Sequence, residues 1–88
     1  MDKLIEMLEA NKGSSLIYYL ENDMYFANSQ VNEYSFEVEG NDIVFHQGND
    51  TELIAFKINT DLIESVSHDA VGTTIIFENG TYLLLETV

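Results

Sequence analysis

The sequence has no cysteine and no arginine, and it has only three lysines among its 88 residues. The lack of cysteine excludes disulfides, thiolate zinc sites and cysteine nucleophiles, and it argues against a disulfide-dependent secreted mini-protein. The lack of arginine removes the bidentate donor that best fits phosphate, which argues against direct binding of DNA or RNA. The sequence therefore predicts a cytoplasmic protein that makes no direct nucleic-acid contact.

Long apolar runs are also missing. No run approaches the 18 residues of a membrane span, and Asp2, Lys3 and Glu6 stand where a signal peptide would need an apolar segment. These features predict a soluble chain that neither enters a membrane nor is exported. A chain of this length supports one core, so we expect a single domain over residues 1–88.

Negative charge is the most prominent feature that is present. Sixteen Asp and Glu residues against three Lys give a formal net charge of −13, beyond the magnitude of about 2 to 8 usual for a small soluble domain. Such a surface repels nucleic acid and anionic membrane and attracts basic protein surfaces. Two interpretations remain open, one in which the charge binds a partner and one in which it only keeps the protein soluble.

No motif in the sequence predicts catalysis. His46 and His68 lie in separate expected strands, and no spacing supports a metal site that they would form with Asp50 or Glu52. Residues 67–69 read Ser-His-Asp, but consecutive strand residues point to alternate faces and cannot form a catalytic relay. The sequence predicts a protein that is not an enzyme, with no catalytic residue, no metal and no cofactor.

The N-terminal half begins with a helical pattern. Leu4 and Leu8 lie four residues apart, which predicts an amphipathic helix over residues 2–12, with Lys12 in its last turn and Gly13 just beyond it. Residues 14–28 are ambiguous. Aromatic and β-branched content favours a strand at Leu16–Leu20, a turn at Asn22-Asp23 and a second strand at Met24–Ala27. The alternative is a second helix over Ser15–Ala27.

Alternating apolar residues then predict a meander. Residues 34–39 and 42–47 should pair around the Gly40-Asn41 turn, with Val38 opposite Ile43 and Phe36 opposite Phe45 facing the core. The same register places Val44 and His46 outside. Further elements are expected as a strand at Glu52–Ile58, a short helical turn at Asp61–Ile63 and a strand at Glu64–His68.

The C-terminus carries the strongest hairpin signal, in which Asn79-Gly80 separates residues 73–78 from residues 81–86. A two-residue turn would pair Phe77 with Tyr82 and Ile75 with Leu84 on one face, and it would pair Ile76 with Leu83 and Thr74 with Leu85 on the other. Because both faces are then apolar, this hairpin lies in a doubly covered sheet, lines a barrel or leaves a surface for a partner.

Together these elements predict an α+β fold. An N-terminal amphipathic helix packs on a coiled, mainly antiparallel sheet, a meander of about five to seven strands that is either open or partly closed into a barrel.

The first functional hypothesis is an acidic protein-binding inhibitor whose carboxylates mimic nucleic acid and occupy the basic groove of a nuclease or another nucleic-acid-handling enzyme. In size and charge the chain resembles phage-encoded inhibitors of bacterial defence nucleases, including anti-CRISPR proteins, and bacterial immunity proteins that neutralise nuclease toxins. The predicted partner-binding residues are outward acids and tyrosines: Glu33, Glu37, Glu39, Asp42, Asp50, Glu52, Tyr18, Tyr19 and Tyr25.

The second hypothesis is a homo-oligomeric structural or accessory subunit that associates through the apolar C-terminal hairpin, with a dimer buried on Ile76, Leu83 and Leu85. High salt should weaken a charge-driven complex and leave such a dimer intact. An enzyme or small-ligand carrier is a third class, because a coiled sheet closed by a helix can enclose a pocket.

Overall fold

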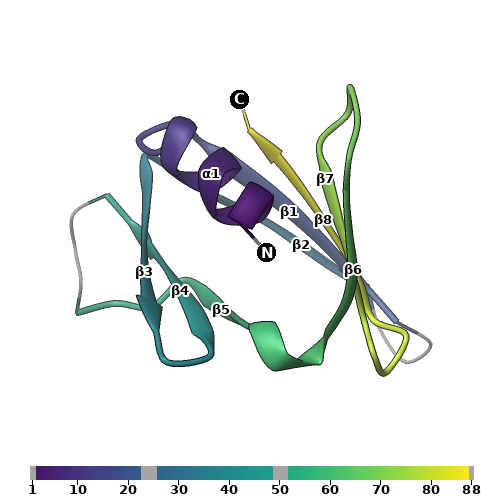
Figure 1. The fold of residues 1–88 in the computed structure, drawn as a ribbon. Helices are drawn as coiled ribbons and strands as arrows, with labels where there is room; N and C mark the ends of the chain where they lie inside the picture. The colour runs from purple at the N-terminus through teal and green to yellow at the C-terminus, as the bar shows by residue number, and fades with distance from the viewer. Residues whose placement is uncertain (1, 23–25, 49–51, 88) are drawn as a thin grey trace.

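The computed structural model describes residues 2–22, 26–48 and 52–87 and shows one helix and two antiparallel sheets (Figure 1). Helix α1 spans Asp2–Ala10. The five-stranded sheet has the order β2-β1-β8-β7-β6, and the three-stranded sheet has the order β3-β4-β5. The strands are β1 (Leu16–Glu21), β2 (Phe26–Val31), β3 (Tyr34–Glu39), β4 (Asp42–Gln47), β5 (Phe56–Asn59), β6 (Ile63–His68), β7 (Thr73–Phe77) and β8 (Tyr82–Thr87).

This architecture confirms the predicted α+β class with its N-terminal helix and antiparallel strands. The expected single coiled sheet is wrong, because the described strands divide between two sheets and neither sheet closes into a barrel. The division occurs at the turn Asn32-Glu33, where Glu33 has a φ of 48° and the chain passes from β2 in one sheet to β3 in the other. Since few non-glycine residues adopt a positive φ, local sequence patterns do not reveal such a turn.

Helix α1 ends two residues earlier than predicted. The backbone N–H and the Nδ2 of Asn11 both donate to the Met7 carbonyl, at 3.2 and 2.9 Å. Lys12 therefore follows the helix and does not belong to its last turn. The predicted apolar face is confirmed, because Leu4 and Leu8 are fully buried.

Strands β1 and β2 are an antiparallel pair, so the alternative helix over Ser15–Ala27 is wrong. Asp23 of the predicted Asn22-Asp23 turn lies outside the described residues. Strands β1 and β2 pair from Leu16 opposite Val31 to Glu21 opposite Phe26. The second strand ends at Val31, four residues beyond the predicted end at Ala27, and its predicted start at Met24 lies outside the described residues. The extension was missed because Asn28, Ser29 and Gln30 are polar and exposed, without the apolar alternation that marks a half-buried strand.

Tyr34 joins the three parts of the fold. Its backbone N–H donates to the Ser14 carbonyl and its own carbonyl accepts from Gly13, both at 3.0 Å, next to the start of β1. Its buried hydroxyl donates to the Leu8 carbonyl of α1 at 2.7 Å. One residue at the start of β3 is thus bonded to the helix and to the segment that enters the five-stranded sheet.

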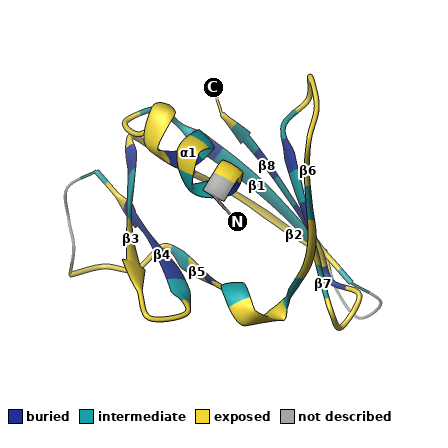
Figure 2. Cartoon of the chain, in the orientation of Figure 1, coloured by how far each residue is buried: buried dark blue, intermediate teal, exposed yellow. Residues whose placement is uncertain are grey.

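The core lies between α1 and the inner faces of the two sheets (Figure 2). Phe45 of β4 stacks on Phe56 of β5, with ring centroids 4.3 Å apart, and Tyr18 of β1 lies 4.4 Å from Phe56. These rings pack one sheet against the other. The remaining buried apolar residues of the core are Leu4, Leu8, Leu16, Val31, Tyr34, Ile43, Ile58, Ile75, Leu83 and Leu85.

The β3–β4 hairpin has the predicted register, with Val38 opposite Ile43 and Phe36 opposite Phe45. The predicted core position of Val38 is wrong, because this residue lies beside the exposed turn and is 56% exposed. The predicted exposure of Val44 and His46 is wrong, because both are buried. The segment before β5 contacts His46, since the Leu53 carbonyl lies 2.9 Å from its Nδ1. Strand β5 begins at Phe56, four residues after its predicted start at Glu52.

The chain between the two sheets follows the prediction. Residues Thr60–Leu62 form a 3-10 turn, with Asn59 as its N-cap accepting a hydrogen bond from the Asp61 N–H at 3.0 Å. Strand β6 follows at Ile63–His68. The expected short helical turn and strand are therefore confirmed with boundaries shifted by one residue.

The C-terminal hairpin exists, but its predicted register is wrong by one residue. Ile75 pairs with Leu83 and Ile76 with Tyr82, because the loop has three residues and is closed by a bond from Phe77 N–H to the Thr81 carbonyl at 2.9 Å. Gly80 has a φ of 85°, which is typical of a type I turn followed by a G1 bulge. A one-residue slip changes which side chains share a face.

Among the described residues, no helix has the length and hydropathy that crossing a bilayer requires.

Replacing Gly72 should destabilise the fold, because a Cβ at this position would lie 2.3 Å from the Leu85 backbone oxygen. We expect Gly72→Ala to reduce the free energy of unfolding by about 1 to 3 kcal/mol, the usual range for overpacking. Urea denaturation measures this, with Ala70→Ser in the same exposed turn as control. Equal stability of the two variants would contradict the close approach.

Tyr34→Phe should alter stability in a pH-dependent way. Burial, and next the charge of Glu9, raise the pKa of Tyr34 to about 12. The folded state thus favours the protonated hydroxyl, and this contribution is lost as the pH rises from about 10 to about 12. We expect the variant to be less stable than wild type by about 1 kcal/mol at pH 8, where the hydrogen bond is lost.

At pH 11 the two proteins should be nearly equal in stability. Wild type has then lost about 1 kcal/mol of stability from the titration of Tyr34, and the variant has no hydroxyl to titrate at this position. Denaturation at both pH values measures the difference. A difference that does not change between pH 8 and pH 11 would contradict the raised pKa.

Candidate interaction surfaces

The outer face of the three-stranded sheet carries three carboxylates, here called the hairpin carboxylates: Glu37, Glu39 and Asp42. Glu39 lies directly opposite Asp42 beside the Gly40-Asn41 turn, and Glu37 points to the same face two residues earlier on β3. Both glutamates are exposed, and Asp42 is half-buried. Like charges directly opposite one another repel, so the pairing of Glu39 with Asp42 is electrostatically unfavourable.

His46 lies beneath this surface and is only 3% exposed. A carbonyl oxygen can only accept, so the 2.9 Å contact with the Leu53 carbonyl places the ring proton on Nδ1. Nε2 has no hydrogen-bond partner and lies 3.9 Å from a carboxylate oxygen of Glu37. In the described parts of the chain no group of three or more His, Cys, Asp and Glu side chains could hold a metal ion.

The other predicted acids do not join the hairpin carboxylates. Glu33 is exposed in the turn before β3, at the opposite end of that strand from Glu39 and about 20 Å from it. Glu52 is exposed in the segment that precedes β5, and Asp50 lies outside the described residues. The structure therefore brings together three of the six predicted acids.

The predicted tyrosine cluster is divided between two faces. Tyr18 points toward the core, where its ring packs on Phe56 at 4.4 Å, while Tyr19 points to the other side of β1. Tyr25 lies outside the described residues. Tyr18 and Tyr19 alternate across the pleat, so they cannot contact one partner side by side.

The outer face of the five-stranded sheet, here called the open face, is a surface that sequence reasoning did not locate. Helix α1 and the core lie on the other side of this sheet (Figures 1 and 2). Phe26, Ile76 and Tyr82 are 61%, 39% and 39% exposed on it. The register places these residues there together with half-buried Ile17, Tyr19, Thr74 and Leu84, and with Asn28, Gln30, Ser65 and Ser67.

The charges on the open face are negative. Glu21 lies between Phe26 and Tyr82 in one cross-strand row, and Glu86 lies opposite Ile17 in another. None of the three lysines of the chain is there, because Lys3 is on α1, Lys12 follows it and Lys57 is on β5. The open face thus combines apolar and aromatic groups with carboxylates.

Sequence reasoning recognised that the C-terminal hairpin is apolar on two faces but chose the wrong residues. Leu83 and Leu85, named for a dimer interface, are 3% and 1% exposed in the core. Ile76 is exposed as expected, next to Tyr82. The sequence did contain a signal for the observed register. Gly80 fits the last position of a three-residue loop with a G1 bulge as well as it fits a two-residue Asn-Gly turn.

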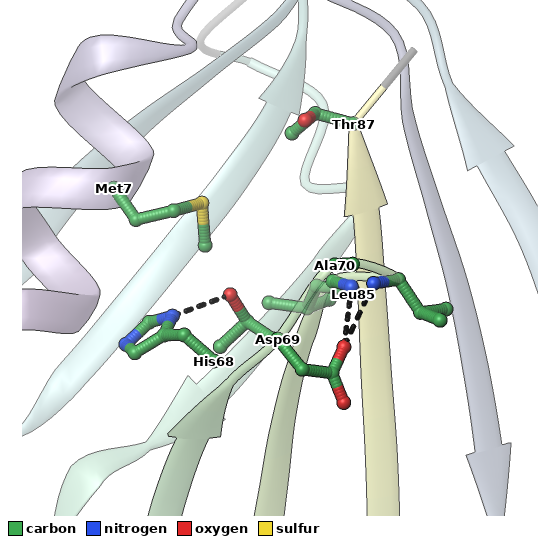
Figure 3. Close-up of a pocket in the computed structure, with 9 residues that line it drawn as sticks. Met7, His68, Asp69, Ala70, Leu85 and Thr87 are labelled. Carbon is green, nitrogen blue, oxygen red and sulfur yellow. Dashed lines mark hydrogen bonds between the residues drawn. The ribbon is translucent and has the colours of Figure 1, made fainter.

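A pocket of about 290 Å³ lies between α1 and the end of the β6–β7 hairpin (Figure 3). Nδ1 of His68 lies 2.8 Å from the Thr73 hydroxyl, and one oxygen of Asp69 accepts the N–H groups of Val71 and Gly72 at 2.8 and 3.1 Å. Asp69 therefore caps its own turn, and His68 is oriented by Thr73. The contacts of His68 and Asp69 are therefore made within the β6–β7 hairpin itself.

Comparison with known proteins gives no match: no family model, no curated protein and no solved structure is similar to this chain. Any functional inference therefore depends on the surfaces described above.

Proposed function

We propose that this chain is an acidic protein-binding module that docks on a basic protein surface through the open face. The observation that carries the proposal is a sheet face that no described element covers and whose apolar centre is flanked by Glu21 and Glu86. Exposed contiguous apolar surface marks interaction sites in soluble domains.

The composition of the open face fits the anatomy of a protein interface. Aromatic residues are enriched at interface centres, where Tyr and Trp supply large contact areas, and polar groups form the rim. Tyr19, Tyr82 and Phe26 would supply the anchors, and Glu21 and Glu86 would pair with Lys or Arg of the partner. A partner with acidic groups would instead meet two like charges.

The hairpin carboxylates have a different role in this proposal. Glu37, Glu39 and Asp42 lie on the outer face of the three-stranded sheet and not on the open face. Together with the net charge of −13 they attract a basic partner before contact, which raises the association rate more than the affinity.

Inhibition follows from the nature of the partner. Proteins that handle nucleic acid carry basic surfaces, because they neutralise phosphates with Lys and Arg. A module that covers such a surface prevents nucleic acid from binding there. The proposed activity is therefore inhibition of a basic nucleic-acid-handling enzyme by occupation of its charged groove.

Self-association through the C-terminal hairpin is the second candidate, and exposed Ile76 and Tyr82 favour it. Five strands of about six residues present roughly 500 Å² of sheet face, so two copies face to face would bury about 1,000 Å², the lower limit for a specific interface. The same contact would bring Glu21 and Glu86 of both copies together. The charges therefore favour a basic partner over a second copy.

The apolar part of the open face should be essential for binding. We expect the double variant Ile76→Ser with Tyr82→Ser to lower affinity for the basic partner at least 10-fold, because two neighbouring exposed apolar side chains of the open face are lost. The partner is first captured at low salt from cells that carry the gene and identified by mass spectrometry. Its dissociation constant is then measured for each variant.

Leu62→Ser is the matched control, because Leu62 is an exposed apolar residue on the 3-10 turn, outside the open face. This variant should bind like wild type. Equal losses in both variants would contradict the proposed site, and capture of the chain's own copies alone would favour self-association.

Carboxylates on the two surfaces should affect different rate constants. The double variant Glu21→Gln with Glu86→Gln should accelerate dissociation, because contacts with the partner are lost. The double variant Glu37→Gln with Glu39→Gln should slow association several-fold and have little effect on dissociation, because these carboxylates only attract the partner before contact. Glu6→Gln with Glu9→Gln on α1 changes net charge equally and is the control. Surface plasmon resonance at about 50 and 200 mM salt separates these effects, and identical kinetics for all three pairs would contradict the assignment.

A further inference from the structure

The edges of the two sheets differ in how they are protected against pairing with another chain. An exposed edge strand presents unpaired N–H and C=O groups, and proteins protect such edges with charges, bulges, proline or short strands. The edge strands of the described structure are β2 and β6 in the five-stranded sheet and β3 and β5 in the three-stranded sheet.

Three of these edges carry protective features. Strand β6 has a register irregularity between Ile63 and Ser65, and Glu64 lies at that point. Strand β3 carries the exposed Glu37 and Glu39. Strand β5 has only four residues and includes Lys57. Pairing at each of these edges is disfavoured by charge, shape or length.

Strand β2 carries none of these features. Its residues Phe26–Val31 read Phe-Ala-Asn-Ser-Gln-Val, without charge or proline, in a chain of which 22% is charged. Its register with β1 is regular over all six pairs. Residues 26 to 30 are all exposed, so no described element covers this edge.

We propose that β2 accepts an extended, positively charged segment of the basic partner as an added strand of the five-stranded sheet. This inference depends on the proposed function, since it describes how the same partner engages the same sheet. Strand addition supplies main-chain hydrogen bonds for affinity, and alternate side chains supply specificity.

The added strand would extend the open face. Phe26, Asn28 and Gln30 point to the same side as Tyr19 and Ile17 of β1. Every second side chain of an added strand would therefore lie beside Phe26, Asn28 and Gln30, in continuity with the apolar centre. Edge and face form one binding surface.

Charge selects a basic segment over a second copy of this chain. Glu21 lies beside Phe26 at one end of β2, and Glu33 lies just beyond Val31 at the other end. A two-fold dimer would pair β2 antiparallel to itself and bring Glu33 of each copy toward Glu21 of the other. A strand with Lys or Arg at both ends would meet both carboxylates with opposite charge.

The test uses a seven-residue peptide of alternating threonine and valine with lysine at both ends, and an otherwise identical peptide with glutamate at both ends. Binding to the full chain is measured at low salt by NMR, together with hydrogen exchange of the β2 amides. We expect the lysine peptide to slow exchange in β2 and to bind at least 10-fold more tightly than the glutamate peptide.

Two proline variants, Asn28→Pro and Ser29→Pro, probe the edge itself. Consecutive strand residues direct their N–H groups to opposite sides, so one of the two prolines removes an outward N–H and leaves pairing with β1 intact. The variant that keeps the wild-type melting temperature should lose peptide binding at least 10-fold. Because slowed exchange in the wild-type chain is an independent readout, the test does not depend on both variants folding.

The outcomes separate this inference from the proposed function. Chemical shift changes confined to the open face, with no slowing of β2 exchange, would overturn strand addition while the proposed function stands. If the lysine peptide does not bind at all, strand addition is also overturned. The proposed function would still be supported if wild type binds the captured partner and the Ile76→Ser with Tyr82→Ser variant does not. If the wild-type chain forms a dimer and the proline variant does not, the strand added at β2 belongs to a second copy of this chain. This result would overturn the basic segment as the occupant.

Discussion

The buried hydrogen bond from the Tyr34 hydroxyl to the Leu8 carbonyl connects helix α1 to the start of β3. Together with the backbone bonds of Tyr34 to Gly13 and Ser14, it holds α1 and the start of β3 at the same side of the five-stranded sheet. Helix and small sheet therefore share one core. Among the described residues, no helix or strand covers the other side of the five-stranded sheet.

An uncovered apolar face and an unprotected edge are usually liabilities, since both promote aggregation. In this protein the net charge of −13 opposes association of identical copies, and the placement of Glu21, Glu86 and Glu33 opposes it at the face and edge themselves. In the proposed function the same charges attract a basic protein. Charge and apolar surface thus act together in the proposed function, with the charge selecting the partner and the apolar groups and strand edge holding it.

Sequence reasoning predicted most elements but only part of the candidate site. The β3–β4 register followed from the Gly40-Asn41 turn, and it correctly brought Glu37, Glu39 and Asp42 to one surface. The open face was missed because one residue in the length of the C-terminal loop decides whether Leu83 and Leu85 or Tyr82 and Leu84 share a face with Ile76. The β2 edge was missed because the polar residues Asn28, Ser29 and Gln30 show no apolar alternation. They are in a strand because they pair with β1.

The sequence by itself determined the charge, the amphipathic helix, the strands with regular alternation and the turns that require glycine, because these depend on composition and on neighbours a few residues apart. Only the tertiary structure decided that the strands form two sheets, that His46 and Val44 are buried, and which face and which edge stay open. These properties depend on contacts between residues far apart in the chain, such as Tyr34 with Leu8 and Tyr18 with Phe56. Local periodicity cannot show which of two apolar faces such contacts will cover.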